Sequence, residues 1–297
     1  MKVSIGIIGG SGLYEIEGIE VVDRIKVDTP FGMPSGDYEI AEIGGRRVAF
    51  LPRHGLGHRK VPTFVNYRAN VYGFKVLGVE RLISFSAVGS LKENINPMDL
   101  VIPDQFFDYT KSRKSTFFED GIAAHVEFAE PVCPSLGKEL LETCRSLDAT
   151  AHEGGCYVCI EGPQFSTKAE SAFFRSLDMT VIGMTNVTEA KLAREAELCF
   201  ATVALVTDYD CWYEGESVSV DMVIGRLKRN AETAARIIKS VVPVLAERPG
   251  CRCGSSLEGA FITPVDAIPP DIKARLGPVI GKYMPERTKE EKEEEQA

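Results

Sequence analysis

The sequence predicts a single α/β domain in which short buried strands alternate with helices. Three apolar runs carry this prediction: Val3 to Ile8, Arg81 to Phe85 and Phe200 to Val206. Each is short, mostly apolar and followed by small polar residues or glycine, and Phe200 to Val206 is of the kind that is buried on both faces. Between Val181 and Leu198 a helical spacing of apolar residues connects two such strands. In open α/β sheets ligands bind outside the carboxyl ends of the strands, so the polar residues there are candidates for a site.

The composition favours one soluble, cytoplasmic domain. Of 297 residues, 44% are hydrophobic, and no run has the ~18 apolar residues of a membrane span or the form of a signal peptide. The net charge of −9 argues against a general nucleic-acid surface but is compatible with a local pocket for a small anion. Without a repeat or a flexible linker, we expect the domain over residues 1–250, a C-terminal extension packed on it over 251–284, and a charged, disordered tail over 285–297.

The first strand ends in Gly9-Gly10-Ser11-Gly12, a turn whose amides can approach a ligand closely. The dinucleotide fingerprint G-x-G-x-x-G is not completed, because Glu15 stands where its third glycine is required. Amides beside the hydroxyl of Ser11 suit a phosphate better than a dinucleotide, and a plain tight turn is the alternative.

Two further strand ends offer groups for the same anion. Gly44-Gly45 predicts a hairpin whose second strand leads into Arg53-His54, and the guanidinium fork matches phosphate oxygens. The strand that begins at Arg81 opens into Ser86. Each of these signals alone is also compatible with a solvated loop, but the convergence of three strand ends predicts an anion site.

The stretch from Val181 to Trp212 has polar residues after both of its strands. Met184-Thr185 follows the first, Asn186 or Thr188 is expected to cap the helix, and Thr207-Asp208-Tyr209-Asp210 follows the second. Elsewhere the pattern predicts strands over 38–43, 46–51, 100–102, 105–107 and 155–160. It predicts helices over 63–77, 134–147, 167–177 and 219–245. A mobile polar loop is expected over 111–121, and little regular structure after Arg248.

The eight cysteines give no clear metal motif. Cys156-x-x-Cys159 has zinc-like spacing, but it lies in an expected strand and no second pair completes a site, so we expect buried strand residues and no metal. Cys251-Arg-Cys253 can close a small, strained disulfide or remain as free thiols, and the residues leave both open.

Taken together, these segments resemble the trimeric purine nucleoside phosphorylases, and within them the 5′-methylthioadenosine phosphorylases. The matching motifs are GIIGGSGLY (6–14), VDTPFGMPS (27–35), PRHGLGH (52–58), VNYRAN (65–70), SAVGSLKE (86–93), IEGPQFST (160–167), GMTNVTEAKLA (183–193) and TDYDCW (207–212). The resemblance implies a central mixed sheet in the form of a distorted barrel, flanked by helices. It also implies a homotrimer or a dimer of trimers with sites at subunit interfaces.

The reaction that the resemblance implies is phosphorolysis of a purine nucleoside to the free base and a pentose 1-phosphate, with phosphate as co-substrate and no cofactor. The implied phosphate-binding residues are Ser11, Arg53, His54, Ser86, Ala87 and Thr185. The implied nucleoside-binding residues are Phe165 and Ser166 at the base, Met184 at the ribose, Asp208 and Asp210 facing the base, and His58, Val220, Val223 and Ile224 around the 5′-substituent, with His58 from a neighbouring subunit. From the residues alone, core packing is the alternative for Phe165.

The proposed chemistry suits the two aspartates. Cleavage of an N-glycosidic bond leaves electrons on the purine, so we expect Asp208 to share or donate a proton at N7, with its pKa raised by burial and by Asp210. A carboxylate also accepts a hydrogen bond from a 6-amino group, where relatives acting on 6-oxopurines have asparagine. The substrate expected is therefore 5′-methylthioadenosine, with adenosine as a second substrate because an apolar pocket discriminates weakly against a hydroxyl.

The resemblance to some hyperthermophilic relatives further implies disulfides between Cys133 and Cys199 and between Cys251 and Cys253. Three other functions match parts of the sequence: a phosphorylase for 6-oxopurine nucleosides or methylthioinosine, a nucleoside sensor without catalysis, and a dehydrogenase, which the incomplete glycine fingerprint disfavours.

Overall fold

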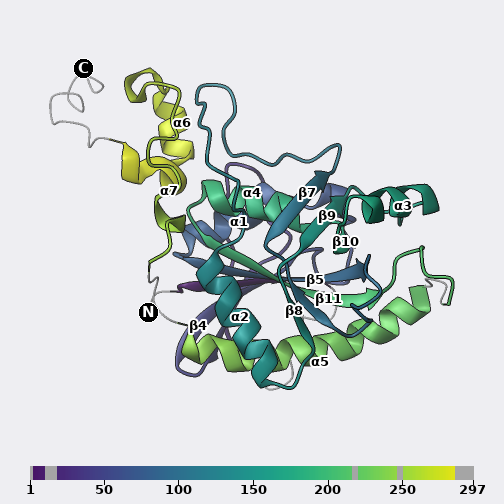
Figure 1. Ribbon diagram of the computed structural model, residues 1–297. Helices are drawn as coiled ribbons and strands as arrows, with labels where there is room; N and C mark the ends of the chain where they lie inside the picture. The colour runs from purple at the N-terminus through teal and green to yellow at the C-terminus, as the bar shows by residue number, and fades with distance from the viewer. Residues whose placement is uncertain (1–2, 11–18, 216–219, 246–249, 285–297) are drawn as a thin grey trace, which may run out of the picture.

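The computed structural model describes residues 3–10, 19–215, 220–245 and 250–284, which form one α/β domain (Figure 1). The strands are β1 (Ile5–Gly9), β2 (Val21–Ile25), β3 (Tyr38–Ile43), β4 (Arg46–Pro52), β5 (Arg81–Ser90), β6 (Leu100–Ile102), β7 (Gln105–Tyr109), β8 (Ala151–Glu153), β9 (Cys156–Ile160), β10 (Val181–Gly183) and β11 (Cys199–Asp208). The helices are α1 (Tyr67–Val76), α2 (Pro134–Ser146), α3 (Lys168–Ser176), α4 (Asn186–Glu195), α5 (Val220–Val244), α6 (Pro270–Arg275) and α7 (Gly277–Ile280), with 3₁₀ turns at η1 (Pro62–Phe64), η2 (Cys253–Ser255), η3 (Val265–Ala267) and η4 (Gly281–Tyr283).

The sheet is mixed and branches at β5. One path runs β2-β3-β4-β1-β5-β10-β9-β7, and a second leaves β5 through β11 to β6 and β8. β1 lies parallel to the first half of β5, and β11 lies parallel to β5 from Arg81 to Gly89. β10 pairs antiparallel with the last two residues of β5, Gly89 and Ser90. The mixed sheet flanked by helices is confirmed, but the expected barrel is not closed among the described strands. The pairing of β11 with β5 has an irregularity between Val206 and Asp208.

Each face of the sheet has its own apolar core. The helices α1 and α4 cover one face and α2 and α5 the other (Figure 1). β1 and β11 are buried along their whole length, as their continuously apolar sequences predict. In α5 the buried residues recur at helical spacing, at Ala234, Ile237, Ile238 and Val241. None of the described helices is long and apolar enough to cross a membrane.

Several elements differ from the sequence prediction. The helix expected over 63–77 is divided into η1 and α1, and β2 was not predicted. Helix α4 has Thr185 at its N-cap position without a side-chain cap, so neither Asn186 nor Thr188 caps it. The Asn186 amide instead donates to the hydroxyls of Ser84 and Thr202 at 2.7 and 3.1 Å. After Arg248 the chain forms the short helices α6 and α7 rather than irregular structure, and the division at residue 250 stays a prediction.

The segment 111–121 is anchored at two points, which the prediction of a mobile loop did not anticipate. Glu161 accepts hydrogen bonds from the amides of Lys111 and Ser112 at 2.6 and 3.1 Å. Glu195 accepts from the Thr116 hydroxyl and the Phe117 amide, both at 2.7 Å. Buried or half-buried carboxylates therefore attach this segment to the sheet and to α4.

All eight cysteines are described, and all are free thiols. Cys156 and Cys159 lie in β9, as expected. Neither the Cys133–Cys199 nor the Cys251–Cys253 disulfide is present, so the structure does not bear out these two pairings. The four sulfur atoms concerned lie in a single cluster, in which the sulfurs of Cys199 and Cys251 are 3.4 Å apart.

Candidate active site

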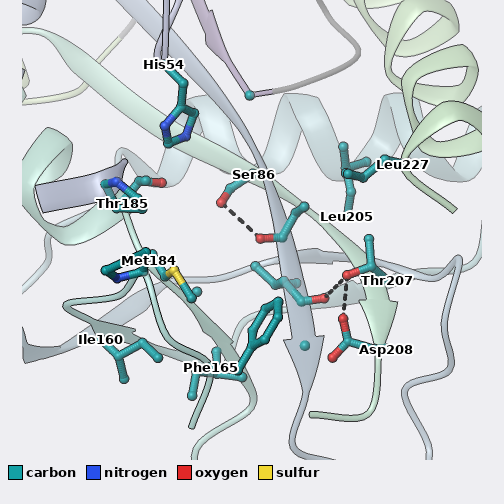
Figure 2. A pocket seen from close by; sticks show the side chains of 18 of the residues that line it. His54, Ser86, Ile160, Phe165, Met184, Thr185, Leu205, Thr207, Asp208 and Leu227 are labelled. Carbon is teal, nitrogen blue, oxygen red and sulfur yellow. Dashed lines mark hydrogen bonds between the residues drawn. The ribbon is translucent and has the colours of Figure 1, made fainter. Parts of the chain in front are cut away.

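The carboxyl ends of β1, β4, β5, β9, β10 and β11 surround a cavity of about 340 Å³ (Figure 2). Of the residues expected at the site, those that line it are Arg53, His54, His58, Ser86, Ala87, Phe165, Ser166, Met184, Thr185, Asp208 and Asp210. Ser11 and the side chains of Val220, Val223 and Ile224 lie outside the described part of the chain. In the view of Figure 2, His54, Ser86 and Thr185 lie toward one end of the cavity, and Phe165 and Asp208 toward the other.

Arg53 follows β4 and is only 1% exposed. Its Nε and Nη2 donate to the two carboxylate oxygens of Glu189, the latter at 3.0 Å, in a bidentate pair. Nη2 also donates to the Ser84 hydroxyl at 2.7 Å, and Nη1 to the Phe85 carbonyl at 3.0 Å. Burial lowers the pKa of Arg53, but the charge of Glu189 outweighs it and the net pKa is raised. The guanidinium is therefore charged and fixed in orientation.

One donor hydrogen of Arg53 remains for a ligand. Among the described residues, four of its five N–H groups have acceptors, and the second hydrogen on Nη1 has none. Nη1 lies 3.7 Å from the position that a Cβ on Gly10 would occupy, and Gly10 also lines the cavity. The free donor thus lies beside the turn after β1.

His54 is a neutral imidazole with a defined tautomer. Its Nδ1 lies 2.8 Å from the Lys60 carbonyl, which can only accept, so Nδ1 carries the hydrogen and Nε2 a lone pair. Burial, followed by the charge of Arg53, lowers the pKa of His54 to about 3. The ring stacks on His58, with centroids 4.2 Å apart. The resemblance implied that a neighbouring subunit supplies this second histidine, whereas the chain's own His58 lines the cavity.

Two hydroxyls lie at the same end of the cavity. Ser86 Oγ is 3.0 Å from the hydroxyl of Tyr157. Thr185 is 4% exposed, and its hydroxyl has no hydrogen-bond partner among the described residues. Because Thr185 occupies the N-cap position of α4, the free amides and the positive end of this helix lie at the cavity too. A guanidinium, a helix N-terminus and two hydroxyls form an environment suited to an anion.

The other end of the cavity contains the two carboxyls. Asp208 accepts hydrogen bonds from the Thr207 hydroxyl at 2.7 Å and from the Asp210 amide at 2.8 Å. Burial, followed by the charge of Asp208, raises the pKa of Asp210 to about 6, although the hydroxyls of Ser171 and Ser166 act to lower it. The expected pKa increase is therefore found at Asp210, and for Asp208 it stays a prediction. Together the two carboxyls can hold one proton near neutral pH.

Gly89 lets β5 pass close to this pair. A Cβ at Gly89 would lie 2.8 Å from Asp208 Oδ1 and 3.1 Å from a methyl group of Ile182. Phe165 extends the cavity toward solvent, since its side chain is 55% exposed rather than packed in a core. The remaining wall is largely apolar and includes Val61, Pro62, Ile160, Leu205, Leu227 and Ala231. An exposed ring beside a carboxyl pair suits a planar heterocycle that carries hydrogen-bonding groups.

Comparisons with known proteins identify the family of this chain. The model of the phosphorylase superfamily matches residues 4–243. The chain belongs to this family. It is 54% identical to the S-methyl-5′-thioadenosine phosphorylase of Koribacter versatilis, over 97% of this chain and 99% of that protein.

Two solved structures of the family have the same fold. A methylthioadenosine phosphorylase from an antarctic soil metagenomic library superposes with a TM-score of 0.89 at 48% identity, covering 94% of this chain and 99% of that one. A double mutant of the adenosine/methylthioadenosine phosphorylase of Schistosoma mansoni, in complex with adenine, gives a TM-score of 0.81 at 33% identity, covering 88% and 99%.

Three residues that orient the site of this phosphorylase-family chain were not predicted from sequence: Glu189 and Ser84, which bind Arg53, and Tyr157, which contacts Ser86. Glu189 is fully buried, in the first turn of α4, on the face toward β5. A buried acidic residue needs a cation or hydrogen-bond donors as partners, and α4 contains both cases: Glu189 pairs with Arg53, and Glu195 accepts from Thr116 and Phe117.

Proposed function

We propose that this protein cleaves 5′-methylthioadenosine with phosphate, giving adenine and 5-methylthioribose 1-phosphate, and that adenosine is a second substrate. One observation carries the proposal: a single cavity has an anion site at one end and an exposed aromatic ring with a protonatable carboxyl pair at the other. The names of the relatives support it. The products would return adenine to purine salvage and the sugar phosphate to methionine salvage.

At the anion end, the co-substrate is hydrogen phosphate. The free N–H of Arg53, the hydroxyls of Ser86 and Thr185 and the α4 N-terminus would donate to its oxygens, and the lone pair on His54 Nε2 would accept from its P–OH. Ser11 and the amide of Ala87 complete the proposed set. Phosphate held in this way has its nucleophilic oxygen oriented before the nucleoside arrives.

The glycosidic bond breaks while the sugar becomes cationic and the purine anionic. The bound phosphate stabilises the oxocarbenium-like sugar electrostatically and then attacks C1′. Met184, which lines the cavity between the two ends, would contact the ribose. No cofactor is required by this scheme.

At the base end, the purine would stack on Phe165 near Ser166, and the carboxyl pair would face N7 and the 6-amino group. The pair supplies one proton to N7, and the raised pKa of Asp210 keeps that proton available near neutral pH. Asp208, with both oxygens already accepting hydrogen bonds, would accept from the 6-amino group and so select adenine. For the 5′-methylthio group we propose His58, Val220, Val223 and Ile224, next to the apolar Leu227 and Ala231.

We place the enzyme in the cytoplasm and propose that it assembles as a homotrimer or a dimer of trimers with sites near the interfaces. No nucleic acid or membrane is a proposed partner. The chain has a net charge of −9, which is consistent with small-molecule substrates only.

The deciding experiment measures phosphorolysis of methylthioadenosine, adenosine and inosine side by side in phosphate buffer. We expect methylthioadenosine to be cleaved with the highest kcat/KM, adenosine with a lower one and inosine with the lowest. If inosine is the best substrate, the chain is a 6-oxopurine phosphorylase. If methylthioadenosine binds and no adenine forms, the chain is a nucleoside sensor.

A further inference from the structure

A second cluster of reactive groups lies outside the cavity just described. Cys133 immediately precedes α2, Cys199 begins β11, and Cys251 and Cys253 lie on either side of Arg252 at the start of the C-terminal segment. Their four sulfur atoms lie within 4.8 Å of one another, and the Cys199 and Cys251 sulfurs are 3.4 Å apart. The chain folds four cysteines from three distant segments onto one point.

The spacing matches a tetrahedral thiolate site better than two disulfides. Zinc binds thiolate sulfur at about 2.3 Å, so the sulfur atoms of a four-thiolate zinc site lie about 3.8 Å apart. The Cys199 and Cys251 sulfurs are 3.4 Å apart, and all four sulfurs lie within 4.8 Å of one another, which is close to this spacing. A disulfide would require two sulfurs at about 2 Å, and all four are free thiols.

Three of the four cysteines are shielded from solvent. Cys133, Cys199 and Cys253 are buried in the core between α2, α5 and the sheet, and Cys251 is half-buried. A metal ion binds the thiolate form, so binding at this point would release the thiol protons.

The surroundings provide compensating charge and a route of entry. Four thiolates around Zn²⁺ carry a net charge of −2, and the N-terminus of the 13-residue helix α2 is directed to Cys133. A neighbouring cavity of about 290 Å³ is lined by Arg194 and Arg252 together with Cys251 and Cys253. It connects the cluster with solvent.

We propose that Cys133, Cys199, Cys251 and Cys253 form a structural zinc site that fastens the C-terminal segment 251–284 to β11 and α2. Four cysteine ligands complete the tetrahedron and leave no position for a substrate, so the site serves stability rather than catalysis. The soft, all-sulfur ligand set selects zinc over magnesium or calcium. This inference does not depend on the proposed reaction.

The test uses the full-length chain, expressed with zinc and purified under a reducing agent, and measures zinc by elemental mass spectrometry. We expect one zinc ion per chain. Cys251→Ser should lower the zinc content, since it removes one of the four ligands, and even the loss of an outer hydrogen-bond partner of a ligand costs about tenfold or more in affinity. The control is Cys156→Ser, which changes another half-buried cysteine, in β9, and should leave the zinc content unchanged.

The unmodified chain gives an independent measurement if Cys251→Ser folds poorly. Co²⁺ in place of zinc should produce the thiolate-to-cobalt charge-transfer band and the intense d–d absorption of a tetrahedral sulfur site. A metal-free, folded chain with eight titratable thiols would overturn the proposal. So would a metal-free chain whose mass lacks two hydrogen atoms for each of one or two disulfides.

Discussion

Glu189 binds Nε and Nη2 of Arg53 through both of its carboxylate oxygens, and neither side chain is accessible to solvent. The guanidinium therefore has its charge balanced and its orientation fixed before any ligand enters the cavity. Its one remaining hydrogen on Nη1 is held beside Gly10. Affinity for phosphate should thus depend on a residue that the phosphate does not touch.

Glu189→Gln should test this dependence. Removing one charge of a buried pair leaves Arg53 uncompensated, so we expect the free energy of unfolding to fall by about 3–5 kcal/mol and the KM for phosphate to rise. Phosphate should restore part of the lost stability, because it supplies negative charge to Arg53. Urea unfolding with and without phosphate measures both effects, and a variant as stable as the unmodified chain would contradict the role assigned to Glu189.

Thr185→Val should weaken phosphate binding without destabilising the fold. The Thr185 hydroxyl has no partner among the described residues, so its removal costs no internal hydrogen bond. A hydrogen bond to a charged ligand is worth about 1.5–3 kcal/mol, which predicts a KM for phosphate increased roughly 10- to 100-fold. Thr188→Val is the matched control, because Thr188 also has a buried, unpartnered hydroxyl but does not line the cavity. Equal KM values for the two variants would exclude Thr185 from the anion site.

Asp208→Asn should change the preferred base. An amide donates to a 6-oxo group where a carboxylate accepts from a 6-amino group, so we expect a large loss of kcat/KM with methylthioadenosine and a relative gain with inosine. Steady-state kinetics with both nucleosides at saturating phosphate measure the ratio. If the ratio does not change, Asp208 does not contact the 6-position.

Activity should fall as pH rises through about 6. The proton donor must be protonated to act, and burial raises the pKa of Asp210 to about 6. We expect kcat/KM for the nucleoside, measured at saturating phosphate, to decrease above this pH. In Asp210→Asn this limb of the profile should be absent and the overall rate low. An unchanged limb in the variant would assign the titration to another group.

Glu195 predicts a pH effect on stability that is separate from catalysis. Burial raises the pKa of Glu195 to about 7, although the hydrogen bonds from Phe117 and Thr116 act to lower it. The pKa of Glu195 in the folded chain lies above its value of about 4.3 in the unfolded chain, so protonated Glu195 favours the folded state. This contribution to the free energy of unfolding is complete below about pH 4.3. As the pH rises to about 7, roughly 3 kcal/mol of it is lost. Glu195→Gln should flatten the stability profile over this window and be more stable than the unmodified chain at pH 8. If the free energy of unfolding of the variant and of the unmodified chain changed in parallel with pH, the role assigned to Glu195 would be wrong.

Local sequence patterns predicted most of the strands, and together with the family resemblance they named eleven of the residues that line the cavity. The end of β4 before Arg53 and the end of β11 at Asp208 could be located because a buried strand has a short apolar sequence and a polar end. The strand expected to end at Phe85 continues to Ser90, because the polar residues from Ser86 onward still pair with β11 and β10. The partner of Arg53 could not be identified, because Glu189 reaches it only through the packing of α4 against β5.

The remaining differences have the same origin in tertiary packing. Asn186 is a good helix-capping residue, but its amide finds Ser84 and Thr202 in the folded chain. The cysteine cluster likewise combines Cys251 and Cys253 with residues more than 50 positions away, so C-x-x-C spacing gave no indication of it. The open, branched sheet depends on where β10 and β11 leave β5, which no local pattern records.

The branching of the sheet at β5 has a consequence for how such an enzyme can evolve. Gly10 and Arg53 follow strands of one branch, and Asp208 ends a strand of the other. Under the proposed function, a lineage can exchange the purine that it accepts by substitutions confined to the end of β11. The phosphate-binding residues, at the ends of β1, β4 and β10 and in β5, are then inherited without change.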